Sequence, residues 1–490
     1  MTTFKLNSNR IKWILLPALA LLCPFVGLRA QEPSSDHSAA FNSPQSEVSC
    51  EVVEQSKATP AAAAPETAPT VPTPVWEATF AAPPTWLLSH RGIVAVGSQF
   101  ASRIAAYDPT TGLLIWDLKL YDPVSAPPLI TDDSLIAVSK DCSVFSIDCT
   151  TGETKSWILP FPYDKLINQE KELLKTKAPS TAPGQRESQA QLRARTQAAA
   201  SRRRFTNQLM HFKLNTLPEL HYSSPLAYRD KYFCISSNGM TVSFSGPNKD
   251  GSSLNPSETE WQDLDSSGIS NKGFISTPVI FSTQDDDYLY AITLDGTLWV
   301  ADMEILGLPL SIKVGEGQHE FRLPLHLVHD LVYAISSQGT IFCYSTNTAS
   351  LAKDRFTPKL LWKFSGAPLN SYQTNQRGQF IGDPTFEPGK PRLFMAVQNK
   401  VWAISKLSGS ILWGRPIEEC VATPVLYVRD NVLVTTETGK LLVLDAPSGQ
   451  IKRSHVLPFV PACPLETDGE RLFIGNMQGK IVCYNLADLL

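Results

Sequence analysis

Cysteine is the residue type in this chain whose spacing comes closest to a redox or metal site. Nine cysteines occur, and those after residue 30 stand at positions 50, 142, 149, 234, 343, 420, 463 and 483. Most lie inside alternating apolar segments, where cysteine commonly acts as a small core residue. Cys142 and Cys149 flank one such segment, and they are the candidate pair for a disulfide if the sheet bends between them.

Two further groups contain residue types that bind metals. His319, His326 and His329 lack the spacing of a zinc motif, so we interpret them as strand or surface residues. The aspartate run at 285–287 lacks the alternating ligands and the glycine of a calcium loop, which favours a solvated turn. We find no nucleophile elbow or phosphate loop. We therefore expect no catalytic residues, no metal and no cofactor.

The densest cluster of charge is basic and contains Arg193, Arg195, Arg202, Arg203 and Arg204. It lies in an insertion at residues 160–215 of a chain that is otherwise mildly acidic, with 43 Lys and Arg against 47 Asp and Glu. The insertion is either a solvated loop or a contact surface for an acidic partner, anionic lipid headgroups or an envelope polymer. The net charge of -4 argues against a nucleic-acid binder.

The N-terminus is typical of an exported protein. Lys5, Arg10 and Lys12 precede an apolar run of about 15 residues, shorter than the roughly 20 of a membrane-spanning helix. We expect residues 1–30 to be a cleaved signal peptide, while lipid attachment at Cys23 stays open. Removing it leaves 39 cations against 47 anions, a net charge of -8. Residues 31–75 are rich in Pro and Ala and predict a disordered linker.

One pattern recurs from residue 76 onward, about every 40 to 50 residues. A proline opens an apolar stretch, and two alternating strands joined by a tight turn follow. The opening residues are Pro84, Pro128, Pro225, Pro278, Pro324, Pro384, Pro424 and Pro464. The strands after the turn begin near Ser102, Cys142, Gly239, Gly296, Gly339, Asn399, Gly439 and Gly479. Each series therefore has eight members.

Each unit is interpreted as four short strands with two half-buried faces, which only stacking around an axis can cover. The last unit ends at Leu490 without its outer strand, while an unassigned strand containing Trp76 precedes the first unit. The N-terminal strand should therefore complete the last blade and close the ring. The sequence predicts an all-β, eight-bladed β-propeller of four-stranded blades over residues 76–490.

These repeats resemble a known family. Ile104–Gly112 followed by Trp116, Val144–Gly152 followed by Trp157, and Leu441–Gly449 are similar to the repeat of the PQQ-like (pyrroloquinoline quinone-like) β-propellers. Within that family, the export signal, the spacer and the eight blades resemble the BamB-like propellers of the outer-membrane β-barrel assembly machinery. The resemblance implies a monomeric, non-enzymatic scaffold of the periplasm or cell envelope that binds an envelope protein partner.

Two alternatives stay open at this point. PQQ-dependent dehydrogenases of the family hold a quinone against two adjacent cysteines, and no two cysteines are adjacent here, so such an enzyme would need a divergent site. A propeller that binds cell-wall or other carbohydrate is the other alternative. Peripheral association with a membrane is compatible with each of these interpretations.

Overall fold

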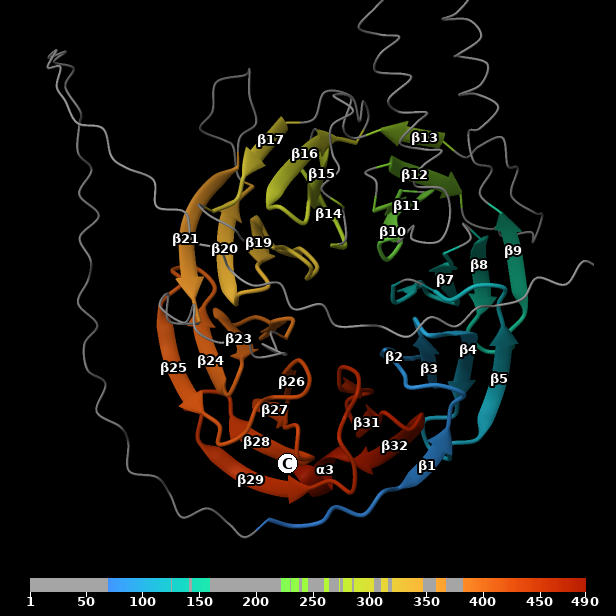
Figure 1. Ribbon diagram of the computed structural model, residues 1–490, viewed down its shortest axis with the longest axis vertical. Helices are drawn as coiled ribbons and strands as arrows, with labels where there is room; N and C mark the ends of the chain where they lie inside the picture. Colours follow the sequence, from blue (N-terminus) through green and yellow to red (C-terminus); the bar gives the residue numbers. More distant parts are fainter. Residues whose placement is uncertain are drawn as a thin grey trace, which may run out of the picture. The chain divides into compact units, whose positions relative to one another are not determined.

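The computed structural model describes residues 69–158, 222–245, 260–263, 273, 276–303, 310–315, 320–346, 358–366 and 382–490, except for positions 125, 141, 142, 230, 238, 239, 284 and 285. These residues form eight four-stranded antiparallel sheets arranged in a ring (Figure 1). The prediction of an eight-bladed β-propeller is therefore confirmed. No helix in this part of the chain is long and apolar enough to cross a bilayer.

Consecutive strands pair within each blade, so four strand positions recur from the axis outwards. The inner strands are β2 (Trp86–His90), β6 (Leu129–Ile130), β10 (Leu226–Tyr228), β14 (Val279–Ser282), β18 (His326–Val328), β22 (Thr385–Phe386), β26 (Leu426–Val428) and β30 (Glu466–Thr467). The second strands are β3 (Ile93–Ser98), β7 (Ser134–Val138), β11 (Lys231–Ile235), β15 (Asp287–Ile292), β19 (Leu331–Ile335), β23 (Arg392–Val397), β27 (Asn431–Thr435) and β31 (Arg471–Gly475).

The third and outer positions complete the blades. The third strands are β4 (Ala101–Tyr107), β8 (Ser143–Asp148), β12 (Met240–Ser245), β16 (Thr297–Asp302), β20 (Thr340–Ser345), β24 (Lys400–Ser405), β28 (Lys440–Asp445) and β32 (Lys480–Asn485). The outer strands are β5 (Leu114–Lys119), β9 (Thr154–Ile158), β13 (Glu260–Asp263), β17 (Leu310–Lys313), β21 (Lys359–Ser365), β25 (Ile411–Pro416), β29 (Ile451–Val456) and β1 (Trp76–Thr79). A short helix, α3 (Leu486–Leu489), follows β32.

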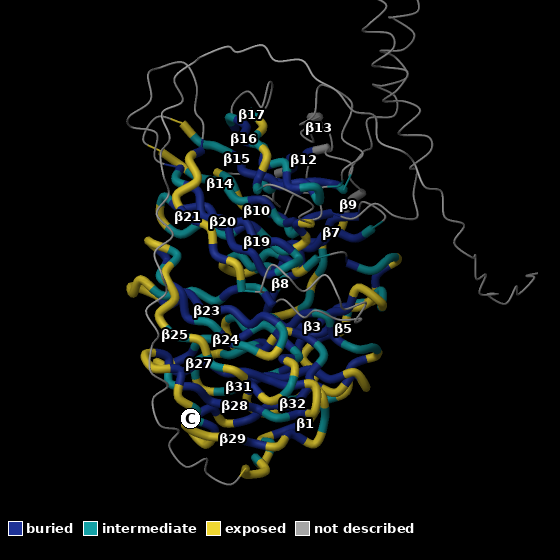
Figure 2. Tube along the Cα trace, turned by 60° about the vertical axis from the view of Figure 1, so that its left-hand side comes forward, coloured by how far each residue is buried: buried dark blue, intermediate teal, exposed yellow. Residues whose placement is uncertain are grey.

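Alternating side chains hold neighbouring blades together. In β28 of blade seven, Leu441 and Val443 belong to the core shared with blade eight, while Leu442 and Leu444 belong to the core shared with blade six. Successive residues of a strand point to opposite faces of a sheet, so one strand supplies two cores. This is why the buried part of the chain is concentrated in the second and third strands (Figure 2).

The ring closes through the two ends of the propeller. β1 pairs antiparallel with β32, with Trp76 opposite Cys483, and the Val75 N–H donates to the Cys483 carbonyl at 2.8 Å. The predicted closure by the N-terminal strand is therefore confirmed. The chain also contacts blade seven before β1, because the Thr70 N–H donates to the Ser454 carbonyl at 3.0 Å. The composition of residues 31–75 does not reveal this contact.

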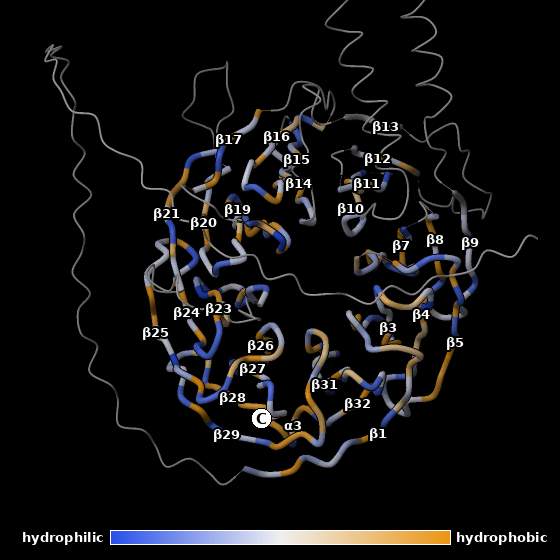
Figure 3. Tube along the Cα trace, in the orientation of Figure 1, coloured by the Kyte–Doolittle hydropathy of each residue, from blue (hydrophilic) through white to orange (hydrophobic). Residues whose placement is uncertain are grey.

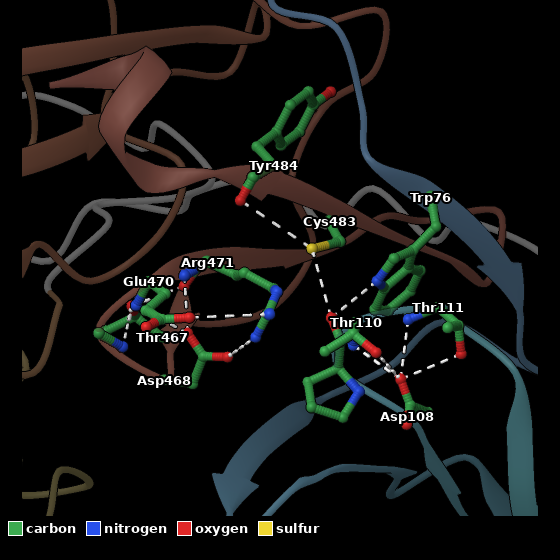
Figure 4. Close-up of polar contacts among 12 residues, drawn as sticks. Trp76, Asp108, Thr110, Thr111, Thr467, Asp468, Glu470, Arg471, Cys483 and Tyr484 are labelled. Atoms are coloured by element: carbon green, nitrogen blue, oxygen red, sulfur yellow. Dashed lines mark hydrogen bonds and ion pairs between the residues drawn. The ribbon is translucent and has the colours of Figure 1, made fainter.

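Tryptophans of the outer strands join one blade to the next. The indole N–H of Trp76 donates to the Pro109 carbonyl at 2.9 Å, in a turn of blade one that Asp108 caps (Figure 4). Gly112 ends this turn at φ 69°, and a Cβ there would lie 2.6 Å from the Trp76 ring. The same junction recurs at Trp116–Cys149, Trp362–Lys406 and Trp413–Ala446. The turn from the capping residue to the glycine of each such repeat thus forms the surface against which the tryptophan of the preceding blade packs.

In blade seven, Arg453 stands at the tryptophan position, opposite Val443, and donates to the Asp488 carbonyl at 3.1 Å. His455, two residues further along β29, makes additional contacts. Nε2 of His455 lies 2.9 Å from the Leu489 carbonyl, and Nδ1 lies 2.8 Å from the Thr70 hydroxyl. A carbonyl only accepts, so Nε2 carries the proton, and in the neutral ring Nδ1 accepts from the hydroxyl. His455 therefore links blade seven to both ends of the described propeller.

Candidate protein-interaction site

The structure describes two of the predicted site residues, Trp76 and Cys149, and not the others. Trp76 is buried at the junction of blades eight and one, where it acts in closure. Cys149 is buried in blade two, and burial raises the pKa of its thiol to about 11. Cys142 and the arginines Arg193, Arg195, Arg202, Arg203 and Arg204 lie outside the described residues. The disulfide and the basic contact element therefore stay predictions.

Two of the three predicted histidines lie in the described part of blade five. His326 lies in β18, and its Nε2 is 2.9 Å from a carboxylate oxygen of Asp383. His329 occupies the next turn at φ 57°, and His319 lies outside the described residues. Within the described part of the chain, no three His, Cys, Asp or Glu residues lie close enough to bind a metal ion.

Glu387 is a fully buried carboxylate where blades six and seven meet. It forms an ion pair with Arg392, another with Lys390 at 3.0 Å, and it accepts a hydrogen bond from the Tyr427 hydroxyl at 3.1 Å. Burial acts to raise the pKa of Glu387, but the hydrogen bonds from Arg392 and Lys390 outweigh it and lower the pKa. A buried charge with this many donors connects the two blades rather than presenting a reactive group.

A groove of about 410 Å³ lies between the outer parts of blades six and seven. Arg415, Glu419 and Lys440 are among the residues that line it. Burial acts to raise the pKa of Glu419, but hydrogen bonds from Lys440 at 2.7 Å and from Thr436 at 2.6 Å outweigh it and lower the pKa to about 2. The carboxylate is thus engaged by the groove's own residues, which favours a structural role.

The two faces of the ring differ in chemistry. One face, which we call the second face, carries the turns between inner and second strands and between third and outer strands. Several of these turns form ion pairs from blade to blade, such as Arg91–Asp133 at 2.8 Å and Lys390–Asp430 at 2.8 Å. Charged side chains of these turns thus pair with one another on a solvated surface, although Leu113 and Leu407 are also exposed there.

The opposite, first face carries large apolar side chains at loop tips on adjacent blades eight and one. Phe100 is 71% exposed, Tyr121 93%, Met477 60% and Val460 39%. We call these four residues the loop patch. Phe100 and Met477 occupy turns between second and third strands, whereas Tyr121 and Val460 lie in loops that lead from one blade to the next. Topology therefore places all four on the same face.

Local hydrogen bonds fix the loops that carry the patch. The Phe100 N–H donates to the Ser98 hydroxyl at 3.1 Å. Asn476 Oδ1 accepts from the Gln478 and Lys480 N–H groups at 2.9 Å each, which shapes the turn of Met477. The loop of Val460 is tied to this turn by a bridge between Pro461 and Asn476. The apolar tips are thus presented on ordered loops, which lowers the entropy lost when a partner binds.

Aromatic and methionine side chains are enriched in protein interfaces, so the loop patch is the candidate interaction site. The sequence reasoning missed it. The available signal is that Phe100 and Tyr121 stand at turn and loop positions where polar residues are the rule. The repeat places each of them in its own loop, but it says nothing about which loops lie beside each other.

Comparisons with known proteins agree with the architecture. The family model of outer membrane protein assembly factor BamB matches residues 69–165 and 295–488, more than half of the chain. BamB from Moraxella catarrhalis has a similar structure, with a TM-score of 0.52 and 12% identity over 85% of this chain and 100% of that one. A search of the curated proteins finds no match.

Two other solved structures share the fold. Sqt1 of Saccharomyces cerevisiae gives a TM-score of 0.54 at 11% identity, over 85% of this chain and 99% of that one. The computationally designed protein Ika8 gives 0.51 at 13% identity, over 83% and 98%. Identities this low show a common fold alone. The family match, which covers both the first blades and the last ones, goes further: the chain belongs to the family of outer membrane protein assembly factor BamB.

Proposed function

We propose that this protein is an exported, non-enzymatic scaffold of the cell envelope that binds a protein partner during outer-membrane protein assembly. The observation that carries the proposal is the loop patch: four large apolar side chains on ordered loops of one face. Such a surface gains affinity by burying apolar area without ordering new segments. Family membership and the signal-like N-terminus support the location, and the partner we propose is a component of the β-barrel assembly machinery.

The basic insertion at residues 160–215 is a second proposed contact element. Its arginines would attract an acidic partner surface, and this attraction weakens as salt is added. Deleting residues 165–205 should therefore lower partner recovery while the circular dichroism of the propeller is unchanged. Unchanged recovery at low and high salt would remove the insertion from the proposal.

Site-specific photo-crosslinking in the envelope tests the loop patch. A photo-reactive amino acid in place of Tyr121 should give one defined protein adduct. The matched control is Glu153, which is exposed in a second-face turn of blade two and should give none. In a strain lacking the chain, a variant with Phe100→Ala and Tyr121→Ala should not restore the normal level of outer-membrane barrels. Equal adducts at both positions, or full restoration by the variant, would contradict the proposal.

The alternatives predict different results with purified protein. Added pyrroloquinoline quinone and calcium should produce neither a stoichiometric chromophore nor dye-linked oxidation of alcohols or sugars; either result would identify a dehydrogenase. Retention on envelope polymers in the absence of any protein partner would identify a carbohydrate-binding propeller.

A further inference from the structure

A second exposed apolar surface lies on the outer rim of blades five and six. Leu360 and Leu361 are the second and third residues of β21 and are 44% and 45% exposed. Leu407 lies in the turn before β25, and Ile411 and Leu412 begin that strand, with exposures of 69%, 45% and 48%. We call these five residues the rim patch. Figure 2 turns this side of the ring forward, and Figure 3 colours stretches of β21 and β25 as hydrophobic.

The tryptophan junction brings the two halves of the rim patch together. The indole N–H of Trp362 in β21 donates to the Lys406 carbonyl at 3.1 Å. A Cβ on Gly409 would lie 2.5 Å from the Trp362 ring. The turn that carries Leu407 is therefore packed against the strand that carries Leu361. The exposed apolar side chains of β21 and of the β25 turn therefore lie next to the same junction.

β-bulges determine whether the rim patch can bind a partner through its side chains or through a free strand edge. Leu361 is the extra residue where the pairing of β20 with β21 shifts register, and Leu412 is the extra residue where β24 pairs with β25. A bulge bends the strand, disturbs its hydrogen-bonding edge and re-aims the extra side chain. The rim patch therefore presents side chains rather than an edge to which another strand could pair.

The charge around the rim patch is positive. Residues 358–366 and 405–416 contain no aspartate or glutamate and, besides the buried Lys406, two lysines and one arginine, although the whole chain carries a net charge of -4. Lys359 and Lys363 are exposed, and the Lys363 ammonium lies 5.4 Å from the centre of the Phe342 ring. Cations therefore stand among the exposed leucines.

Aliphatic side chains with lysines and no acids are the composition of a membrane-contacting surface. The apolar groups enter the boundary between headgroups and acyl chains, and the cations attract anionic lipids. Protein interfaces instead favour aromatic residues, Met and Arg and are depleted of Lys. Phe100, Tyr121 and Met477 of the loop patch fit this description, and the leucines and lysines of the rim patch do not. We propose that the rim of blades five and six rests on an anionic membrane surface.

The position of the rim patch is compatible with simultaneous partner binding. In an eight-bladed ring, blade five lies opposite blade one, which carries part of the loop patch (Figure 1). Leu407, Ile411 and Leu412 also follow or occupy a turn on the second face, whereas the loop patch is on the first face. A ring resting on lipid through blades five and six would therefore leave the loop patch open to a protein.

The chain offers a matched control for this proposal. In blade one, Leu114 and Ile115 occupy the positions of Ile411 and Leu412, and they and the preceding Leu113 are also exposed. The charges around them balance, because Asp108 lies in the preceding turn, Asp117 of the same strand is paired with Arg103, and Lys119 ends the strand. This surface is also apolar but lacks the net positive charge of the rim patch, so an anionic membrane should bind it less tightly.

Partitioning onto lipid vesicles tests the proposal. The protein used is the mature chain purified from the envelope of cells that express it. The protein should bind vesicles of phosphatidylglycerol and phosphatidylethanolamine more tightly than vesicles of phosphatidylcholine. Lys359→Gln with Lys363→Gln should weaken binding to the anionic vesicles about 30-fold, since each lysine near such a surface contributes about a fivefold factor. Leu361→Ser with Leu412→Ser should weaken it by about tenfold.

The control variant Leu114→Ser with Ile115→Ser should bind within about twofold of the unchanged protein. Circular dichroism of every variant shows whether the propeller is folded. Equal loss in the control and rim variants, no loss in the rim variants, or equal binding to phosphatidylcholine would overturn the proposal. So would rim variants that keep vesicle binding but lose the photo-adduct of Tyr121, because the rim would then be a protein surface.

Discussion

Removing the Trp76 side chain should loosen the closure of the ring. Trp76 is 8% exposed, donates to the Pro109 carbonyl at 2.9 Å and lies 5.9 Å from the Phe473 ring, centre to centre. Trp76→Ala deletes all of these contacts and leaves a cavity beside the Gly112 turn, where the indole ring was. The four residue pairs between β1 and β32 would then depend mainly on backbone hydrogen bonds and on the exposed Glu77–Lys480 ion pair at 2.8 Å.

The size of the effect follows from known truncations. Replacing a buried tryptophan with alanine typically costs 3 to 5 kcal/mol, cavity included. The lost aromatic pair and the carbonyl left without its donor belong to the same change. We therefore expect the free energy of unfolding to fall by about 4 kcal/mol. Trp76→Phe keeps most of the apolar contact but not the hydrogen bond, and it should cost about 2 kcal/mol.

Urea unfolding measures the energy, and amide hydrogen exchange shows where it is lost. Trp116→Ala is the matched control, because Trp116 makes the same hydrogen bond to the Cys149 carbonyl at 2.9 Å but joins blades one and two. Both variants should lose similar stability, whereas only Trp76→Ala should speed exchange in β1 and β32. A loss below about 1 kcal/mol, or the same exchange pattern in both variants, would refute the reasoning about closure.

Three further predictions concern the blades themselves. Gly449→Ala forces a φ of 68° on alanine and puts a Cβ 2.6 Å from an indole ring, so it should cost about 3 kcal/mol in urea unfolding; Gly469→Ala, at φ 91° with open space around it, should cost only about 1 kcal/mol. Burial raises the pKa of Glu466 from 4.5 to about 7, so folding takes up a proton between these values. Stability should therefore fall by about 3 kcal/mol as the pH rises through this range, and Glu466→Gln should flatten the slope of urea midpoints. The predicted Cys142–Cys149 disulfide should leave both thiols resistant to alkylation until reduction, and mass analysis that finds only free thiols would remove it.

Much of the fold could be predicted because its signals are local. The opening prolines, such as Pro424, stand just before inner strands, and the turn glycines, such as Gly439, stand just before third strands. Period-two alternation and turn chemistry act over a few residues, so they survive in a single sequence. The role of Trp76 could also be predicted, since a final blade without an outer strand needs one from elsewhere.

The contacts that were missed depend on residues distant in the sequence. Thr70 lies in a segment whose composition predicts no structure, yet it pairs with β29 and His455. Glu387 looks like an ordinary turn residue, but Arg392 and Tyr427 enclose it. In both cases the stabilising partner belongs to another strand or blade, and no local sequence pattern predicts the contact.

The amino-acid sequence by itself determined the number of blades, the order of their strands and the joining of the two ends, because period-two alternation repeated eight times leaves apolar faces that only a closed ring can cover. Only the tertiary structure decided which exposed apolar side chains share a surface. Phe100 and Met477 stand near opposite ends of the chain, and ring closure places them on adjacent blades. The exposure of a side chain and the residues that surround it depend on the blade packed next to it. That neighbouring blade is in place only once the ring has formed.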